Sequence, residues 1–205
     1  MALLMVHLLA ADAWAARHPE FMDCPEFYLG SISPDAIHVR DHDDKSHKNE
    51  IHLGNWKGLN ERGVLDYWKE RREPFDIGYG IHVLTDAQWV EAYRTNFPCL
   101  LLPNGMVDRE QYYHDTMATD FELYRGSERL RGLLKTVMSA RVPGDHPLLT
   151  ETEFRQWREW TRDMYEKGGR ERAEAVYLTV GYARGFVLSC QALMDALYAR
   201  AFPEA

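Results

Sequence analysis

The chain has 205 residues, with 24 Lys and Arg against 32 Asp and Glu, so that its formal charge is −8. This length is typical of a single domain that buries a sizeable core without disulfides or structural zinc fingers. Charged residues are interleaved with aromatic and aliphatic ones, which excludes a disordered chain, and the acidic balance argues against a nucleic-acid-binding platform.

The predicted elements are helices, because apolar residues recur at spacings of three and four along almost the whole chain. We find no internal repeat and no sustained strand-like alternation. We therefore expect an all-α fold, a single compact domain over residues 1–205 with seven or eight helices. In chain order, the predicted helices run from Leu3 to His18, Pro25–Leu29, Leu59–Arg72, Phe75–Phe97, Val107–Tyr124, Ser127–Ala140, Thr150–Glu166 and Arg170–Ala201.

Two stretches interrupt the helical pattern in the first half of the chain. In the turn Gly30–Asp35, Ser33 is expected to cap the next helical turn, and Asp35 stands at the start of that turn. From Val39 to Asn55 the sequence is polar and aperiodic, which predicts one long loop. Loops of this length within a domain are usually functional.

The cysteines and the apolar start of the chain bear on location. Cys24, Cys99 and Cys190 are an odd set without metal-binding spacing, so we expect reduced thiols and a cytoplasmic protein. The first segment is apolar but lacks a basic start, and His7 and Asp12 interrupt it, so we interpret it as part of the mature fold. No uncharged apolar run is long enough to predict a transmembrane segment.

The most informative segment for chemistry is Gly78–Asp86. It places His82 and Asp86 four residues apart on one helix face, where they can bind the same cation. Gly78 and Gly80 weaken this helix locally, which is understandable if another backbone or a ligand approaches closely. The alternative interpretation is a core histidine hydrogen-bonded to its own aspartate.

Three further residues of ligand type lie at predicted helix faces or element ends: His7, Asp35 and His52. An all-α scaffold builds convergent sites from facing helices, and imidazole with carboxylate suits zinc, manganese or iron better than calcium. Each residue also has a plainer interpretation, which is core packing for His7, a helix cap for Asp35 and an ordinary loop position for His52.

Four segments together resemble the zinc-dependent phospholipase C family, in its compact bacterial branch, over about the first 125 residues. They are Met1–Ala10, Phe27–His38, Lys48–Leu53 and Gly78–Asp86. The resemblance implies a helical domain of the phospholipase C and P1 nuclease type, with zinc as the expected metal and one to three ions bound. The ligands that it implies for one metal are Asp35, His52, His82 and Asp86; His7 would bind a second metal, with Asp86 bridging.

The sequence also departs from that family. Secreted phospholipases use a mature N-terminal amine and a downstream His with a His-x3-Glu set for a third metal, whereas here Met1 is expected to be kept and only His114 and His146 follow Asp86. A full trinuclear site is therefore not expected. On the helix around His114, we predict that Asp120 joins the metal site; its alternative is a solvated helix face.

The expected activity is hydrolysis of a small phosphorylated substrate by a metal-activated water, with Asp35 or another carboxylate that is not fully engaged accepting the proton. Residues expected to neutralise phosphate charge are Arg40, Lys45 and Lys48, and residues expected to shape a pocket wall are Tyr79, Trp56, Trp89 and Tyr113.

Two alternatives stay open. An HD-type phosphohydrolase would use one of the doublets His42-Asp43 and His114-Asp115. A non-catalytic, metal-stabilised binding module would hold its metal in a closed site, since structural sites keep no open position. Roughly the last 80 residues show no ligand pattern, and they are expected to complete the core or to form a homodimer surface.

Overall fold

The computed structural model describes residues 3–41, 47–54, 60–168 and 173–203. Within these ranges the elements are helical, apart from one isolated bridge between Leu101 and Val107, so the expected all-α fold is confirmed. The α-helices are α1 (Leu4–Ala15), α2 (Pro25–Gly30), α3 (Ile37–Arg40), α4 (Lys48–Ile51), α5 (Glu61–Glu70), α6 (Pro74–Asn96), α7 (Arg109–Gly126), α8 (Glu128–Ser139), α9 (Glu151–Lys167) and α10 (Val180–Ala201), with short 3-10 turns η1 (Pro19–Phe21), η2 (Ser33–Ala36) and η3 (Pro98–Leu100).

Helix caps account for several boundaries. Ser127 accepts a hydrogen bond from the Leu130 amide at the start of α8, and Thr150 forms a capping box with Glu153 at the start of α9. The expectation for Ser33 is wrong. Its hydroxyl donates to the carbonyl of Leu29 at 2.7 Å, so it satisfies an acceptor in the last turn of α2 and does not cap η2.

The expected start of the last helix, at Arg170, is also wrong. Helix α10 begins at Val180, where the side chain of Thr179 accepts from an amide of the first turn. The preceding amides of residues 176–178 all donate to the carboxylate of Asp115, at 2.6 to 3.0 Å. This side chain competes with helix formation for the backbone donors, and spacing alone could not reveal it.

The polar segment expected to be one long loop contains helical turns at both ends. Helix α3 extends to Arg40, and α4 covers Lys48–Ile51 just before His52. Residues 42–46 between them lie outside the described ranges. The described helices number ten instead of seven or eight because this segment adds two single-turn helices that periodicity over a long window does not detect.

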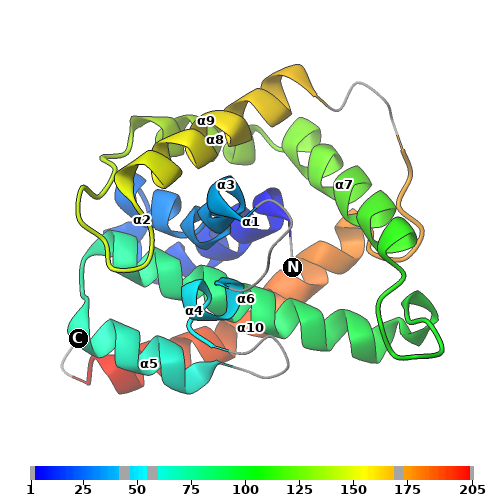
Figure 1. Cartoon of the computed structure of the whole chain (residues 1–205), viewed down its shortest axis with the longest axis horizontal. Coiled ribbons are helices and arrows are strands. Elements are labelled where there is room, and N and C mark those ends of the chain that lie inside the picture. The colour runs from blue at the N-terminus through cyan, green and yellow to red at the C-terminus, as the bar shows by residue number, and fades with distance from the viewer. Residues whose placement is uncertain (1–2, 42–46, 55–59, 169–172, 204–205) are drawn as a thin grey trace.

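Helix α1 runs through the middle of the molecule and contacts α6, α7, α8 and α10 (Figure 1). Nine of its 12 residues are buried, as expected for a helix that is apolar on every side. His7 is one of the buried residues. The helix therefore places an imidazole in the core of the domain.

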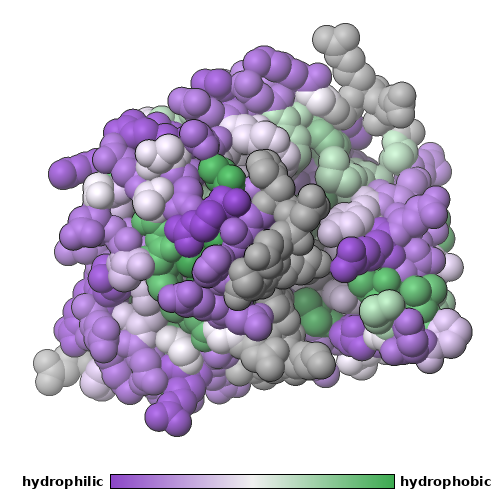
Figure 2. Space-filling view, in the orientation of Figure 1, coloured by the Kyte–Doolittle hydropathy of each residue, from purple (hydrophilic) through white to green (hydrophobic). Residues whose placement is uncertain are grey.

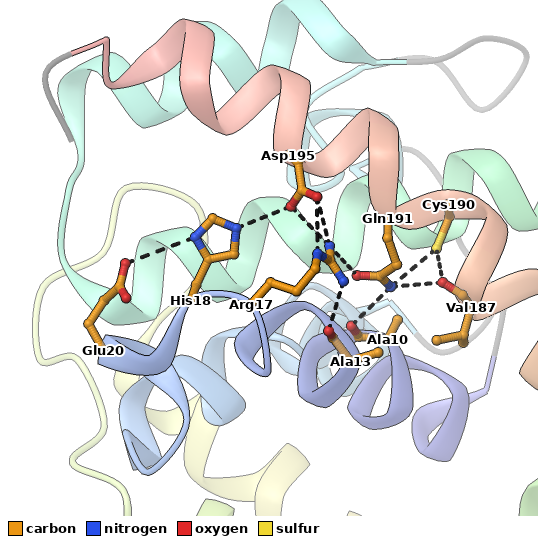
Figure 3. A network of polar contacts seen from close by, with 9 residues as sticks. All are labelled: Ala10, Ala13, Arg17, His18, Glu20, Val187, Cys190, Gln191 and Asp195. Atoms are coloured by element: carbon orange, nitrogen blue, oxygen red, sulfur yellow. Dashed lines mark hydrogen bonds and ion pairs between the residues drawn. The ribbon is translucent and has the colours of Figure 1, made fainter.

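A polar network ties the C-terminal end of α1 to α10 (Figure 3). The Arg17 guanidinium donates to both carboxylate oxygens of Asp195 at 2.9 and 3.0 Å and to the Gln191 side-chain oxygen at 3.0 Å. His18 Nε2 lies 3.1 Å from the same carboxylate. Because the ion pair is well exposed, it contributes orientation more than stability, and it fixes which face of α1 meets α10.

Helices α2 and α6 cross at two glycines that allow their backbones to touch. A Cβ on Gly30 would lie 2.0 Å from the carbonyl oxygen of Phe75, and a Cβ on Gly78 would lie 2.0 Å from the carbonyl oxygen of Phe27. The expectation that another backbone approaches Gly78 is thus confirmed. The close crossing brings the C-terminal end of α2, at Ser31, against α6 one turn beyond Gly78.

The surface and the cysteines are consistent with the composition. The face shown in Figure 2 is mostly hydrophilic, with hydrophobic residues gathered in small patches. Cys24, Cys99 and Cys190 are free thiols, as expected. Among the described helices, none combines the length and the apolar character that a membrane crossing requires.

Candidate metal centre

Four buried side chains from three separate segments converge at one point. Asp35 comes from η2, His52 follows α4, and His82 and Asp86 lie one turn apart on α6. One ligand atom from each residue lies within 4.8 Å of the others, and this group could hold a metal ion. The structure therefore brings together the four residues that the sequence singled out; we call them the four-residue group.

The distances within the group are those of ligands around a shared cation. His52 Nε2 lies 3.5 Å from Asp35 Oδ1 and 3.6 Å from Asp86 Oδ2, and His82 Nε2 lies 3.9 and 3.7 Å from the same two atoms. These separations are too long for hydrogen bonds. Zinc ligands at about 2.0 Å in a tetrahedron are about 3.3 Å apart, so a small closure of the group would suit zinc.

Backbone carbonyls fix both imidazoles in one tautomer. His82 Nδ1 donates to the carbonyl of Ser31 at 2.9 Å, and His52 Nδ1 donates to the carbonyl of Lys48 at 3.1 Å. Because a carbonyl only accepts, each Nδ1 carries the proton and each Nε2 directs a lone pair into the group. The alternative of a core histidine bonded to its own aspartate does not fit, since His82 and Asp86 are 3.7 Å apart.

The electrostatics of the group favour deprotonated ligands. Burial and the neighbouring His7 lower the pKa of His82 to about 3, so this imidazole is neutral. Burial disfavours the charged form of Asp35, yet His82, His52 and the cation of Lys48 outweigh it and hold the pKa of Asp35 well below its usual value. An ionised carboxylate at Asp35 and a neutral imidazole at His82 are the protonation states that bind a divalent metal.

The turn that carries His52 has an unusual backbone. Leu53 has φ 57° and Gly54 has φ 137°, and the second value favours glycine. Tyr79 lies beneath this turn, fully buried, and its hydroxyl donates to the carbonyl of Ile51 at 2.6 Å. Tyr79 was expected to shape the wall of a substrate pocket, but its placement supports a role in holding the His52 turn.

His7 lies beside the four-residue group but outside it. Its ring stacks on that of His82 with centroids 3.7 Å apart, and its Nε2 lies 3.3 Å from Asp86 Oδ1. The other oxygen of Asp86, Oδ2, faces His52 and His82. The two oxygens of one carboxylate therefore face two sets of imidazoles, an arrangement compatible with the expected bridging role of Asp86.

Asp120 is buried, but it does not reach the four-residue group. Its Oδ1 accepts from the Met5 amide at 3.0 Å in the first turn of α1, and its Oδ2 accepts from the hydroxyl of Tyr165. Burial raises its pKa to about 7. Helix α1 has no cap from its own N-cap residue, so Asp120 serves as a cap supplied from α7.

This placement predicts that Asp120→Asn is tolerated and Asp120→Ala is not. The amide of Asn retains an acceptor for Met5 and a donor for Tyr165, so we expect a change of less than about 1 kcal/mol in the free energy of unfolding. Ala leaves both partners buried without a hydrogen bond, which costs about 2 kcal/mol. Urea unfolding of the two variants at pH 7 measures the difference, and equal losses would contradict a capping role.

The remaining predicted residues are placed as follows. Arg40 donates to both carboxylate oxygens of Glu153, at 2.6 and 2.9 Å, so its expected role in binding phosphate lacks support. Lys48 is buried and lowers the pKa of Asp35, as noted above. Trp89 is a core residue, whereas Tyr113 is half exposed on α7. Lys45 and Trp56 lie outside the described residues.

The doublets expected for an HD-type enzyme gain no support. The carboxylate of Asp115 is occupied by the amides of residues 176–178 and by the side chain of Gln111 at 2.8 Å. His114, its neighbour, is half exposed. The other doublet, His42-Asp43, lies outside the described residues.

One residue near the group was missed from the sequence. His38 Nε2 lies 3.9 Å from Asp35 Oδ1, and its side chain is one-third exposed. Its position three residues after Asp35 in a helical turn is a signal that could have indicated the contact.

A second polar cluster, formed by Tyr67, Asp76 and His146, lies next to Tyr79. The Tyr67 hydroxyl donates to Asp76 Oδ1 at 2.6 Å and contacts His146 Nε2 at 2.9 Å. The Leu148 amide donates to His146 Nδ1 at 3.3 Å, so the proton of the neutral ring is on Nε2 and is donated to Tyr67. Burial lowers the pKa of His146 to about 4.

His146 therefore predicts a loss of stability in mild acid. In the unfolded chain this imidazole takes up a proton near pH 6.5, whereas in the folded state it does so only near pH 4. The free energy of unfolding then falls as the pH drops through this window, by about 3 kcal/mol from this group. Urea unfolding at several pH values gives the free energy of unfolding as a function of pH. Between pH 4 and 6.5 this free energy should change less steeply for His146→Gln than for the wild type; equal pH dependence in the two proteins would show that His146 is not the group responsible.

Comparison with known proteins adds no relative. No family model, no curated protein and no solved structure matches this chain. The resemblance to the phospholipase C family therefore stays a prediction, and function has to be argued from the geometry of the four-residue group.

Proposed function

We propose that this protein is a metal-dependent hydrolase of phosphoester bonds, with zinc as its metal and a small phosphorylated molecule as its substrate. The observation that carries the proposal is the pair of imidazoles whose Nδ1 protons are held by carbonyls, so that both Nε2 atoms face Asp35 and Asp86. Two nitrogens and two carboxylate oxygens form a donor set typical of zinc.

The roles of the four residues would differ with their exposure to solvent. His52, His82 and Asp86 are almost fully buried and would hold the metal, whereas Asp35, 7% exposed, is the least buried member of the group. A bound divalent cation supplies an acidified water and polarises a phosphoryl oxygen. Asp35, the fourth donor, lies nearest to solvent, where its carboxylate would accept a hydrogen bond from the bound water and orient it, with the buried cation of Lys48 nearby to balance charge.

The second candidate is a non-catalytic module in which the metal only stabilises the fold. The almost complete burial of three of the four ligands favours it, because structural zinc sites are closed. The two candidates differ in whether a bound metal keeps a position for water and substrate.

The experiment measures zinc per chain by mass spectrometry and then hydrolysis of bis(4-nitrophenyl) phosphate and 4-nitrophenyl phosphate, with and without a chelator. We expect bound zinc and hydrolysis that the chelator abolishes and added zinc restores. Stoichiometric zinc without hydrolysis of either ester would favour the structural module. A chain that binds no divalent metal would overturn both candidates.

A further inference from the structure

A pocket of about 460 Å³ lies between α3 and α9, next to the four-residue group. It is lined by His38, Val39, Gln156, Trp157 and Trp160. His38 is the link to the group, because its Nε2 is 3.9 Å from Asp35 Oδ1. The pocket therefore adjoins the least buried of the four residues.

Both walls of this pocket are fixed to the segment that carries Asp35. The indole nitrogen of Trp157 donates to the carbonyl of Ile32 at 2.8 Å. The paired hydrogen bonds between Arg40 and Glu153 join the end of α3 to the first turn of α9. A pocket held in this way needs little rearrangement to receive a ligand.

The lining selects for a flat, uncharged group. The rings of Trp157 and Trp160 are stacked with centroids 4.9 Å apart and an angle of 17° between their planes. Trp157 is buried, whereas Trp160 is 53% exposed. The buried indole of Trp157 therefore supports the stacked indole of Trp160, which is accessible to a ligand. The lining contains no carboxylate, lysine or arginine among the described residues, and Gln156 supplies its amide for hydrogen bonds.

We propose that this pocket holds a planar aromatic ring of the substrate, stacked on Trp160, while the phosphoester of that substrate reaches Asp35. The inference rests on the proposed function and adds the class of substrate to it, namely phosphoesters that carry an aromatic ring. Stacking of a planar ring on an aromatic side chain contributes about 1–3 kcal/mol, which corresponds to a preference of about 5- to 150-fold over a ligand without the ring.

The test measures binding of phenylphosphonate and methylphosphonate to the zinc-loaded protein by titration calorimetry. We expect the wild type to bind phenylphosphonate at least about 5-fold more tightly. Trp160→Leu should remove that preference and leave methylphosphonate binding unchanged, and Trp160→Phe should retain most of it. Because Trp160 is more than half exposed, these variants are expected to fold, which thermal unfolding checks.

Tyr113→Leu is the matched control, since Tyr113 is another half-exposed aromatic residue on a helix, in a separate pocket lined by α7. It should keep the wild-type preference. Retention of the preference in Trp160→Leu, or equal binding of both phosphonates by the wild type, would overturn the aromatic assignment while leaving hydrolysis intact. Failure to bind any phosphonate, together with no hydrolysis of either nitrophenyl ester, would instead sink the proposed function itself.

Discussion

The His82→Ala variant is expected to lose zinc from the four-residue group and, with it, phosphoester hydrolysis. His82 supplies a buried Nε2 that faces both carboxylates of the four-residue group. Loss of an outer partner of a metal ligand already costs 10- to 100-fold in affinity. Loss of the ligand itself should therefore weaken zinc binding by more than about 100-fold.

The measurement is zinc per chain after dialysis against a weak chelator, followed by the hydrolysis assay. His114→Ala is the control, because His114 is half exposed beside Asp115 and belongs to the doublet of the HD-type alternative. It should keep both zinc and activity. Full zinc stoichiometry in His82→Ala would exclude His82 as a ligand, and loss of zinc in His114→Ala would revive the HD-type interpretation.

The Gly78→Ala variant is expected to lose about 4 kcal/mol of stability, which is large for the addition of one methyl group. The new Cβ would lie 2.0 Å from the Phe27 carbonyl oxygen, so α2 and α6 would have to separate by about 1 Å or more to restore normal contact. That shift also moves the Ser31 carbonyl away from His82 Nδ1, so zinc affinity should fall together with stability.

Gly185→Ala provides the matched control. Gly185 lies in α10, and the position that its new methyl group would occupy has no described atom within 4 Å, so the substitution should stabilise the protein by up to about 1 kcal/mol through helix propensity. Urea unfolding and zinc titration of both variants give the comparison. A Gly78→Ala protein as stable as the wild type would show that the crossing of α2 and α6 is not as close as described.

Much of the fold was predictable because it depends on local patterns. The long amphipathic or apolar helices α6 and α9 followed from spacing, a starting proline and a capping box. The start of α10 was not, because it depends on a carboxylate of α7, Asp115, that is more than 60 positions away in sequence. Short turns such as α4 are also missed, because periodicity needs several turns to become visible.

In the site, too, local patterns were predictable from the sequence and contacts between distant residues were not. Residue type and spacing singled out His7, Asp35, His52, His82 and Asp86 as ligand types. The resemblance to the phospholipase C family implied the last four as one set, and the structure brings those four together. Asp120 has the right chemistry, but its partners are the Met5 amide and the Tyr165 hydroxyl, and sequence does not reveal which buried groups a carboxylate will satisfy. The pairing of Arg40 was not predictable for the same reason, since its partner Glu153 lies 113 positions away.

The central position of α1 has a consequence for biosynthesis. Helix α1 precedes the other described helices in the chain, yet the side chain of Arg17 at its end meets Asp195 of α10 across 178 positions. The face of α1 that packs against α10 therefore stays uncovered until α10 has been synthesised, so the native packing of α1 is completed late in folding.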